Sequence, residues 1–414
     1  MSDNANVVAT SGAVTWSGTW PNCTGTITPV ANANGSADIT FVISDGFLTA
    51  SQTFTLSVTA VNDAPTLAAI SAKSTAEDTP TVAIAVTVSD VDGPAQTCNS
   101  TYLNYTSGTT TVVAGTGAVT WGGTWPNCTA VIAPIANANG TSSISFTASD
   151  GSLTSAAQSF TLTVTAVNDA PTLAAIINQS TNEDTSTSAI AVTVSDVDGP
   201  SQTCNATFLS YTSGTTSVVA GTGAVTWGGT WPNCTAVIAP VANANGTSLI
   251  TFTASDGTAT SIGQSFTLTV NAVNDAPTIS DVTDKTTDED VALTGIAVTI
   301  NDVDGTLSCT SSLSASSTDS VLLPNGSITF GGTYPNCTVS ILSAPNKYGV
   351  ATVTLTVSDG SASAQDSFIL TVNSVPDITN MSAIPSPQLT NEDTPLAVTM
   401  TLDNGDGGFS CSAN

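Results

Sequence analysis

Short runs in which hydrophobic and polar residues alternate recur along the whole chain. Ile84, Val86 and Val88 alternate with Ala and Thr, and Ile144 and Phe146 alternate with Ser. A period of two in runs rich in β-branched residues predicts strands with one buried face. Gly, Asn, Asp and Pro clusters separate the runs, and no window shows a helical period. The pattern therefore predicts an all-β chain.

The runs belong to a repeating unit. Val-Asn-Asp-Ala-Pro begins at residues 61, 167 and 273, which is a period of 106. Trp-Pro-Asn-Cys, Ser-Asp-Gly and Glu-Asp recur at corresponding places, with Tyr-Pro-Asn-Cys in the last copy. A unit of this length has room for about seven strands, which is the size of one β-sandwich. The sequence therefore predicts a tandem array of sandwiches.

The repeats do not start at the first residue. We expect complete sandwiches at 64–168, 170–274 and 276–376. Residues 377–414 correspond to the N-terminal part of a split repeat, and residues 1–60 correspond to its C-terminal part. Aligned on their shared motifs, these two end segments nearly sum to one further repeat.

Eight cysteines follow the same period, two in each complete repeat. One pair per repeat at a fixed spacing predicts disulfides and an oxidising compartment, and free buried thiols are the alternative. The absence of His and of Cys-x-x-Cys argues against a zinc site. Cys23 and Cys411 are left over, and we expect them to pair with flanking sequence or with each other between chains. The predicted pairs are Cys98 with Cys128, Cys204 with Cys234, and Cys309 with Cys337.

Charge narrows the range of partners. The chain has 31 acidic residues, 3 Lys or Arg and no His, giving a net charge of −28. This balance argues against nucleic acid as a partner and disfavours anionic membrane surfaces, because both attract a basic surface. No apolar run approaches the ~20 residues of a membrane helix, so membrane insertion is not expected. Residues 1–20 have no basic start and no apolar core, so we expect no signal peptide within them.

Most of the acidic residues fall in four short motifs: Glu-Asp, Asp-Val-Asp-Gly, Ser-Asp-Gly and Asn-Asp-Ala-Pro. Clustered carboxylates repel one another, and almost no Lys or Arg is present to neutralise them. Calcium accepts six to eight oxygen ligands and is the cation that such clusters suit best. The alternative is that these Asp and Asn side chains cap turns through hydrogen bonds to the backbone.

The order of these four motifs resembles that of cadherin repeats. It is more similar still to the bacterial cadherin-like and Ig-like tandem repeats of large surface proteins and adhesins. The resemblance covers essentially the whole chain and implies a linear array of Ig-like or cadherin-like sandwiches with calcium between consecutive domains. The acidic Leu-Asp-Arg-Glu-like motif of animal cadherins is absent. One or two ions per junction are therefore expected instead of three.

The resemblance also implies which residues ligate calcium. The first junction would use Asn62, Asp63, Asp90, Asp92 and Asp150. The second would use Glu77, Asn168, Asp169, Asp196, Asp198 and Asp256. The third would use Glu183, Asn274, Asp275, Asp302, Asp304 and Asp359. A fourth is in doubt, because residues 373–377 depart from the linker motif.

Two other kinds of site have weaker support. No His, no Arg and no nucleophile or phosphate-binding motif is present, so we expect no enzymatic activity. Tryptophans four residues apart could form a platform that stacks on a surface glycan, or they could pack beside the core. They are Trp16 with Trp20, Trp121 with Trp125, and Trp227 with Trp231.

These observations predict an extracellular or cell-surface structural protein, a calcium-stiffened stalk or filament used in adhesion or as a scaffold. The alternative is a fibre subunit that binds itself head to tail, residues 377–414 of one chain completing a sandwich with residues 1–60 of the next. A carbohydrate- or ice-binding module is the third hypothesis.

Overall fold

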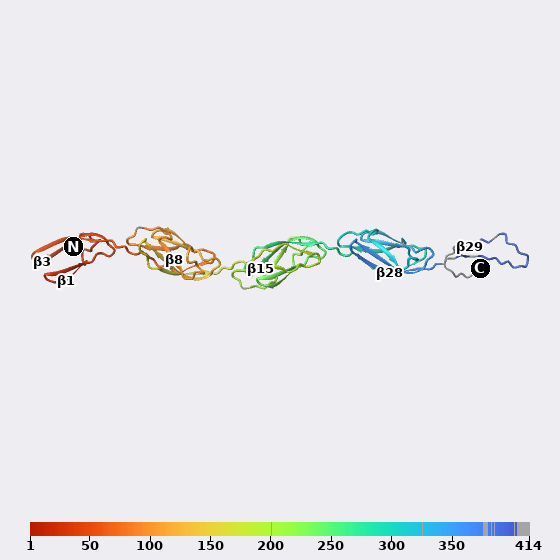
Figure 1. The fold of residues 1–414 in the computed structure, drawn as a ribbon, viewed down its shortest axis with the longest axis horizontal. Coiled ribbons are helices and arrows are strands. Elements are labelled where there is room, and N and C mark those ends of the chain that lie inside the picture. The colour runs from red at the N-terminus through yellow and green to blue at the C-terminus, as the bar shows by residue number, and fades with distance from the viewer. Residues whose placement is uncertain are drawn as a thin grey trace. The chain divides into compact units, whose positions relative to one another are not determined.

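The structure is a computed structural model that describes residues 1–93, 95–199, 201–324, 326–375, 380–381, 383–384, 386–400 and 402–403. Every regular element in these residues is a β-strand (Figure 1). The described residues contain no helix long and apolar enough to cross a membrane. The chain divides into two compact units, Met1–Asp169 and Ala170–Asn414, which are described separately.

The complete repeat of the first unit is a sandwich of two four-stranded sheets. One sheet has the order β5-β7-β10-β9 and the other the order β6-β12-β11-β8. Strand pairs are antiparallel except β6 with β12, which run parallel. The strands are β5 (Thr66–Leu67), β6 (Lys73–Ala76), β7 (Ile84–Ser89), β8 (Leu103–Ser107), β9 (Val119–Thr124), β10 (Asn127–Ile132), β11 (Gly140–Ala148) and β12 (Gln158–Thr165).

The second unit contains two copies of this topology, with sheets β13-β15-β18-β17 and β14-β20-β19-β16, then β21-β23-β26-β25 and β22-β28-β27-β24. The first copy consists of β13 (Thr172–Leu173), β14 (Gln179–Asn182), β15 (Ile190–Ser195), β16 (Leu209–Ser213), β17 (Val225–Thr230), β18 (Asn233–Ile238), β19 (Gly246–Ala254) and β20 (Gln264–Asn271). The second consists of β21 (Thr278–Ile279), β22 (Lys285–Asp288), β23 (Leu293–Asn301), β24 (Leu313–Ser317), β25 (Ile328–Thr333), β26 (Asn336–Ile341), β27 (Gly349–Ser358) and β28 (Ser363–Asn373).

The predicted all-β sandwich class is confirmed, with eight strands per repeat when the two-residue strands are counted. The domain limits 64–168, 170–274 and 276–376 stay predictions.

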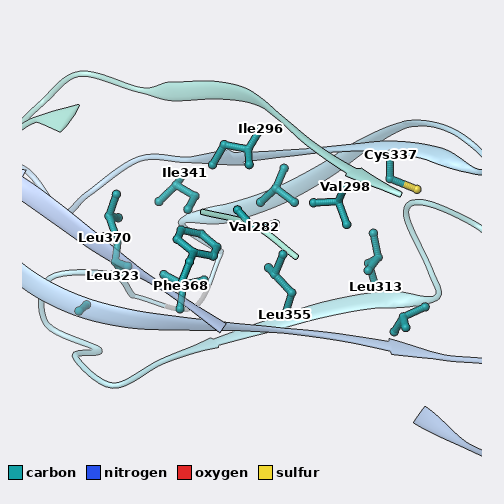
Figure 2. Close-up of a cluster of buried hydrophobic side chains, with 14 of the residues drawn as sticks. Val282, Ile296, Val298, Leu313, Leu323, Cys337, Ile341, Leu355, Phe368 and Leu370 are labelled. Atoms are coloured by element: carbon teal, nitrogen blue, oxygen red, sulfur yellow. The ribbon is translucent and has the colours of Figure 1, made fainter. Parts of the chain in front are cut away.

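Each sandwich has its own core, formed by the alternating apolar residues of both sheets. In the last complete repeat, Val298 of β23 and Leu355 of β27 face each other across the two layers, and Phe368 of β28 fills the space beside them (Figure 2). All three side chains are buried. Because side chains alternate along a β-strand, every second one lies in this layer. Short runs of Val, Ile and Thr are therefore enough to form the core.

The three predicted cysteine pairs are disulfide-bonded in the structure. Cys98 bonds Cys128, Cys204 bonds Cys234, and Cys309 bonds Cys337, with Cα–Cα distances of 5.5, 5.5 and 5.3 Å. Cys23 is free and exposed, and Cys411 lies outside the described residues. Three disulfides in a chain of this kind are typical of proteins outside the reducing cytosol.

A glycine fixes the hairpin that carries one cysteine of each pair. Gly123 of β9 has a φ of 83° and pairs with Cys128 of β10. A Cβ at this glycine would lie 2.5 Å from the carbonyl oxygen of Asn127, so no other residue fits without a shift of the backbone. The same constraint holds at Gly229 and Gly332.

Residues 1–60 form only part of such a sandwich, namely two separate two-stranded sheets. The hairpins are β1 (Val14–Thr19) with β2 (Asn22–Ile27), and β3 (Gly35–Ser44) with β4 (Thr49–Val58). In the described part beyond residue 375, the only sheet is β29 (Asn380–Met381) with β30 (Leu402–Asp403).

The disulfides make a direct contribution to stability that can be measured. We expect Cys204→Ala with Cys234→Ala to lower the free energy of unfolding of that repeat by roughly 3.5 kcal/mol, because a loop of about 30 residues is no longer closed in the unfolded chain. Differential scanning calorimetry of the full chain would show one transition moved to lower temperature. Cys23→Ala, which removes a thiol that forms no bond, is the control and should leave all transitions in place.

Candidate metal centre

The glutamate of the Glu-Asp motif is buried at the end of each complete repeat, beside the linker that follows. Glu77, Glu183 and Glu289 are only 2, 3 and 3% exposed. One carboxylate oxygen of each accepts a hydrogen bond from a linker backbone amide, at 2.6, 2.6 and 2.7 Å. The donors are Val167, Val273 and Val375. The second oxygen of each glutamate is buried and has no hydrogen-bond partner.

The aspartate of each Glu-Asp motif has a different role, which the sequence did not predict. Asp78 and Asp184 adopt left-handed backbone conformations, with φ of 57° and 58°. Their Oδ1 atoms accept hydrogen bonds from the amides of Asn137 and Asn243, at 2.9 and 3.0 Å. Asp tolerates this conformation better than most residues. The spacing between Asp and Asn is 59 residues in these two repeats and 56 in the third, where the amide of Asn346 donates to Asp290.

In the first and last complete repeats, the Asp-x-Asp-Gly motif joins the repeat to the linker that precedes it. The Oδ1 atoms of Asp90 and Asp302 accept the amides of Asp92 and Asp304, at 3.2 and 2.9 Å. The Oδ2 atoms of Asp92 and Asp304 in turn accept the amides of the linker residues Asp63 and Asp275, at 2.7 and 2.6 Å. The remaining oxygen of Asp90 is buried and has no partner, as is that of Asp196 in the middle repeat.

The Ser-Asp-Gly aspartate both caps its turn and holds the linker. Asp150 accepts the amides of Ser152 and Leu153 at 2.6 and 2.7 Å through Oδ1, and Asn62 donates to its Oδ2 at 2.7 Å. Asp359 is bonded in the same way, with Asn274 donating to it at 2.9 Å. Asp150 and Asp359 therefore cap turns, as the alternative hypothesis expected, and they also contact the linker.

These hydrogen bonds lower the pKa of both aspartates. For Asp150 the largest cause is the backbone amide of Leu153, followed by the Asn62 side chain. For Asp359 the order is Ala362 and then Asn274. A carboxyl whose pKa is lower in the folded state stabilises the fold above its unfolded pKa, and that stabilisation is lost as the pH falls. Both aspartates therefore stabilise the linkers at neutral pH.

The pKa of Asp275, in the second unit, is shifted in the opposite direction. Its Oδ2 is buried without a partner, although the residue as a whole is only partly buried. Desolvation is the largest cause of a raised pKa at Asp275, and the charges of Asp184, Asp304, Glu183 and Asp302 add to it. Carboxylates of both neighbouring repeats repel Asp275, and the ionised form of Asp275 is therefore destabilised in the folded state.

The three expected ligand sets differ in how far the structure brings them together. The first set lies within one unit, where Asn62 contacts Asp150 and Asp63 contacts Asp92. The third also lies within one unit, where Asn274 contacts Asp359 and charge reaches Asp275 from Glu183. The second is divided between the units, with Glu77, Asn168 and Asp169 in one and Asp196, Asp198 and Asp256 in the other. No group of three or more acidic side chains among the described residues is arranged to hold a metal ion as the side chains stand.

The donor set nevertheless fits a hard cation. Glu183 Oε2, at the end of one repeat, and Asp275 Oδ2, in the linker that follows, are buried, unpartnered carboxylate oxygens. Buried charged oxygens normally have a hydrogen-bond donor or a cation as partner. Carboxylate and amide oxygens without His or thiolate ligands suit calcium, and magnesium would need a stricter octahedral geometry.

The tryptophans of the complete repeats pack against the cores. Trp121 and Trp227 are partly buried and contact Phe146 and Phe252 edge-on, with ring centroids 5.0 and 4.9 Å apart. Trp125 and Trp231 are also partly buried against the same cores. Packing beside the core is therefore their observed role.

Comparison with known families gives a match for two of the three complete repeats. Residues 62–163 and 274–373 match the family model described as a bacterial Ig domain. Comparison with curated proteins gives no match.

Several solved structures resemble the chain. Extracellular cadherin domains 1–5 of protocadherin gamma B2 share 16% identity, with 87% of this chain and 71% of that chain covered and a TM-score of 0.43. Domains EC22–24 of mouse cadherin-23 share 15% identity over 76% of this chain and all of that chain, with a TM-score of 0.38. A three-Ig-domain structure of titin shares 10% identity over 75% of this chain and 98% of that chain, with a TM-score of 0.34. At these identities the similarity extends to the fold alone.

The raised pKa of Asp275 predicts an unusual pH dependence. In chelator at pH 7, we expect Asp275→Asn to raise the melting temperature of the second unit, because the variant removes a charge that the folded state disfavours. The gain should shrink as the pH falls towards about 4, since the carboxyl of the parent chain then becomes protonated. Asp359→Asn is the matched control with the opposite sign, because the pKa of Asp359 is lowered. If both variants shift the melting temperature in one direction, the assignment is wrong.

The left-handed aspartate can be tested by two substitutions at one position. Asp184→Ala loses the bond to Asn243 and disfavours the left-handed backbone, so we expect the repeat to lose about 1–3 kcal/mol. Asp184→Asn retains an acceptor and tolerates the conformation, so its cost should stay under about 0.5 kcal/mol. Urea denaturation of the full chain measures both, and equal losses in the two variants would contradict the role.

Proposed function

We propose that this chain is part of an extracellular structural or adhesion protein, whose Ig-like repeats are locked to one another by calcium at the linkers. Tandem repeats of this fold are typically structural or adhesive and not enzymatic. The disulfides and the matches to bacterial Ig domains support a location outside the cytosol.

A single observation carries the calcium part of the proposal. Glu183 at the end of one repeat and Asp275 in the linker to the last complete repeat each hold one buried carboxylate oxygen without a partner. Glu183 belongs to the earlier repeat, and Asp275 is hydrogen-bonded to Asp304 of the later one. A cation that binds both oxygens would tie the two repeats together and remove the repulsion at Asp275.

The chain's own residues prepare this arrangement. Glu183 holds the linker through the amide of Val273, while Asp304 and Asp359 hold Asp275 and Asn274. The bond from Val273 occupies one oxygen of Glu183 and leaves the other for a ligand, as Asp275 Oδ2 is left, whereas both oxygens of Asp359 are hydrogen-bonded. Calcium would supply the positive charge that three Lys and no Arg cannot supply.

Calcium binding is tested by isothermal titration calorimetry of the full chain, paired with thermal melting in calcium and in chelator. A site filled to a hundred times its dissociation constant adds about 2.7 kcal/mol, which corresponds to a rise of roughly 10–20 °C for a domain of this size. We expect Asp302→Asn with Asp304→Asn to remove the ions of one linker from the stoichiometry.

The matched control is Asp319→Asn with Asp366→Asn, which also removes two charges. Both of these side chains accept hydrogen bonds from backbone amides within their own repeat. The control should retain the full calcium stoichiometry. Absence of any calcium heat in the parent chain would refute the calcium proposal.

A further inference from the structure

The last complete repeat lacks an aromatic side chain that the other two complete repeats share. Tyr105 of β8 and Tyr211 of β16 occupy equivalent places, and Ala315 of β24 takes this place in the last repeat. The strand register fixes the equivalence, because Tyr105 pairs with Phe146 as Ala315 pairs with Leu355. One position of the fold therefore carries a phenol ring in two repeats and only a methyl group in the third.

The tyrosine closes one edge of the sandwich. β8 is the outermost strand of one sheet and β9 is the outermost strand of the other. Tyr105 is partly buried against the core, and its hydroxyl donates to the carbonyl of Ala114 at 2.9 Å and accepts the amide of Ala118 at 2.8 Å. Tyr211 forms the same two bonds in its own repeat, both at 2.9 Å. The phenol therefore joins the edge strand β8 to the loop that enters β9.

The corresponding loop of the last repeat closes without a side chain. It is one residue shorter than the loop between β8 and β9. The amide of Ser327 donates directly to the carbonyl of Pro324 at 2.9 Å. These two groups are the equivalents of the Ala118 amide and the Ala114 carbonyl, which the tyrosine hydroxyl bridges. The backbone of this loop is thus satisfied in the absence of a tyrosine.

The space of the missing ring remains open. A cavity of about 330 Å³ lies at the edge of the sandwich, and its lining includes Ala315, Ser316, Leu323, Pro324 and Ile328. None of the lining residues that the structure describes is charged. The volume is within the range of pockets that bind small molecules.

Neighbouring side chains have not grown to refill this space. Leu355 takes the place of Phe146, and Phe330 takes the place of Trp121, so aromatic volume is lost there as well. Leucines replace the two buried valines of the adjoining loop and add only one methylene group each. Protein interiors leave few voids larger than a water molecule. A cavity at a place that two sister repeats fill with a ring therefore indicates an occupant from outside the chain.

We propose that this cavity binds a phenol, that is, a small neutral aromatic ring with one hydroxyl group. The ring would lie against Ala315, Leu323 and Ile328, where the other repeats place their own tyrosine. Its hydroxyl would donate to the carbonyl of Pro324, as the hydroxyl of Tyr105 donates to its equivalent. Cavities with apolar walls in protein interiors bind small aromatic molecules.

Differential scanning calorimetry of the full chain with 4-methylphenol, which is the side chain of tyrosine without its backbone, tests this site. We expect a dissociation constant of roughly 0.1–1 mM, as is usual for a ligand of this size. At ten times that concentration the last complete repeat should melt roughly 5–10 °C higher, and the repeats that contain Tyr105 and Tyr211 should gain nothing. Toluene, which lacks the hydroxyl, should bind about tenfold more weakly. No gain in the last repeat overturns the proposal.

Two substitutions fill the cavity from within the protein. Ala315→Tyr and Ala315→Leu should each abolish the gain in 4-methylphenol, and the second variant covers the case in which the larger ring does not fit the shorter loop. Ser314→Leu is the matched control, because it adds the same side chain at an exposed position of the same strand. It should respond to 4-methylphenol like the parent. A gain that survives both substitutions at Ala315 contradicts the site.

The reverse substitution creates the same cavity in another repeat. Tyr105→Ala should lower the melting temperature of the first complete repeat, because a ring and two hydrogen bonds are lost. We expect 4-methylphenol to restore part of that loss, and toluene to restore less. Absence of any recovery would show that this position of the fold does not hold a free phenol, and the proposal would then be wrong.

A phenol of this shape is either a free small molecule or the tyrosine side chain of another protein. N-acetyltyrosinamide distinguishes the two sources. If it raises the melting temperature of the last repeat as 4-methylphenol does, the site takes a tyrosine presented by a partner. If only 4-methylphenol acts, the site takes free phenols. Both results support the cavity as a phenol site. The cavity lies within one repeat, so the gain should be the same in calcium and in chelator, and the calcium proposal can fail without affecting this one.

Discussion

The structure depends on a buried glutamate beside each linker, whose two carboxylate oxygens have different surroundings. At Glu77, Glu183 and Glu289, one oxygen fixes the backbone of the following linker and the other is buried without a donor. Leaving a charged oxygen buried and unpaired is costly, and such groups persist where a ligand or ion satisfies them. The position of this glutamate therefore couples the end of each sandwich to the chain that enters the next one.

The shortage of basic residues makes this coupling between sandwich and linker stronger than it would be in an ordinary domain. Exposed charges in most proteins are balanced by Lys and Arg, and this chain has 3 such residues against 31 acidic ones. At Asp275, burial and then the charges of four neighbouring carboxylates raise the pKa. This shortage of basic side chains is one reason why we propose a divalent cation at these sites, and it leaves the sheet surfaces to neutral Ser and Thr.

The sandwiches themselves are independent of this chemistry. Each buries its own core, such as Val298, Leu355 and Phe368 in the last repeat, and each is closed by its own disulfide. Residues 1–60 hold a smaller core with five buried apolar residues: Val7, Val8, Ala13, Ala37 and Ile39. The stability of each complete repeat thus resides in its own core and disulfide, separately from the carboxylates at the linkers.

The sequence by itself determined the all-β class, the tandem repeats and the cysteine pairs, because a period of two and a fixed spacing are local properties. It also singled out the aspartates of Asp-x-Asp-Gly and Ser-Asp-Gly, which the resemblance implies to be calcium ligands, but their hydrogen bonds to the linker came from the structure. Only the tertiary structure decided that Asp78 and Asp184 bind the Asn137 and Asn243 turns instead of facing the linker, because these partners are brought together by strand pairing 59 residues apart. Burial is likewise a property of the assembled sandwich, which is why the unpaired oxygens of the glutamates could not be found from the sequence.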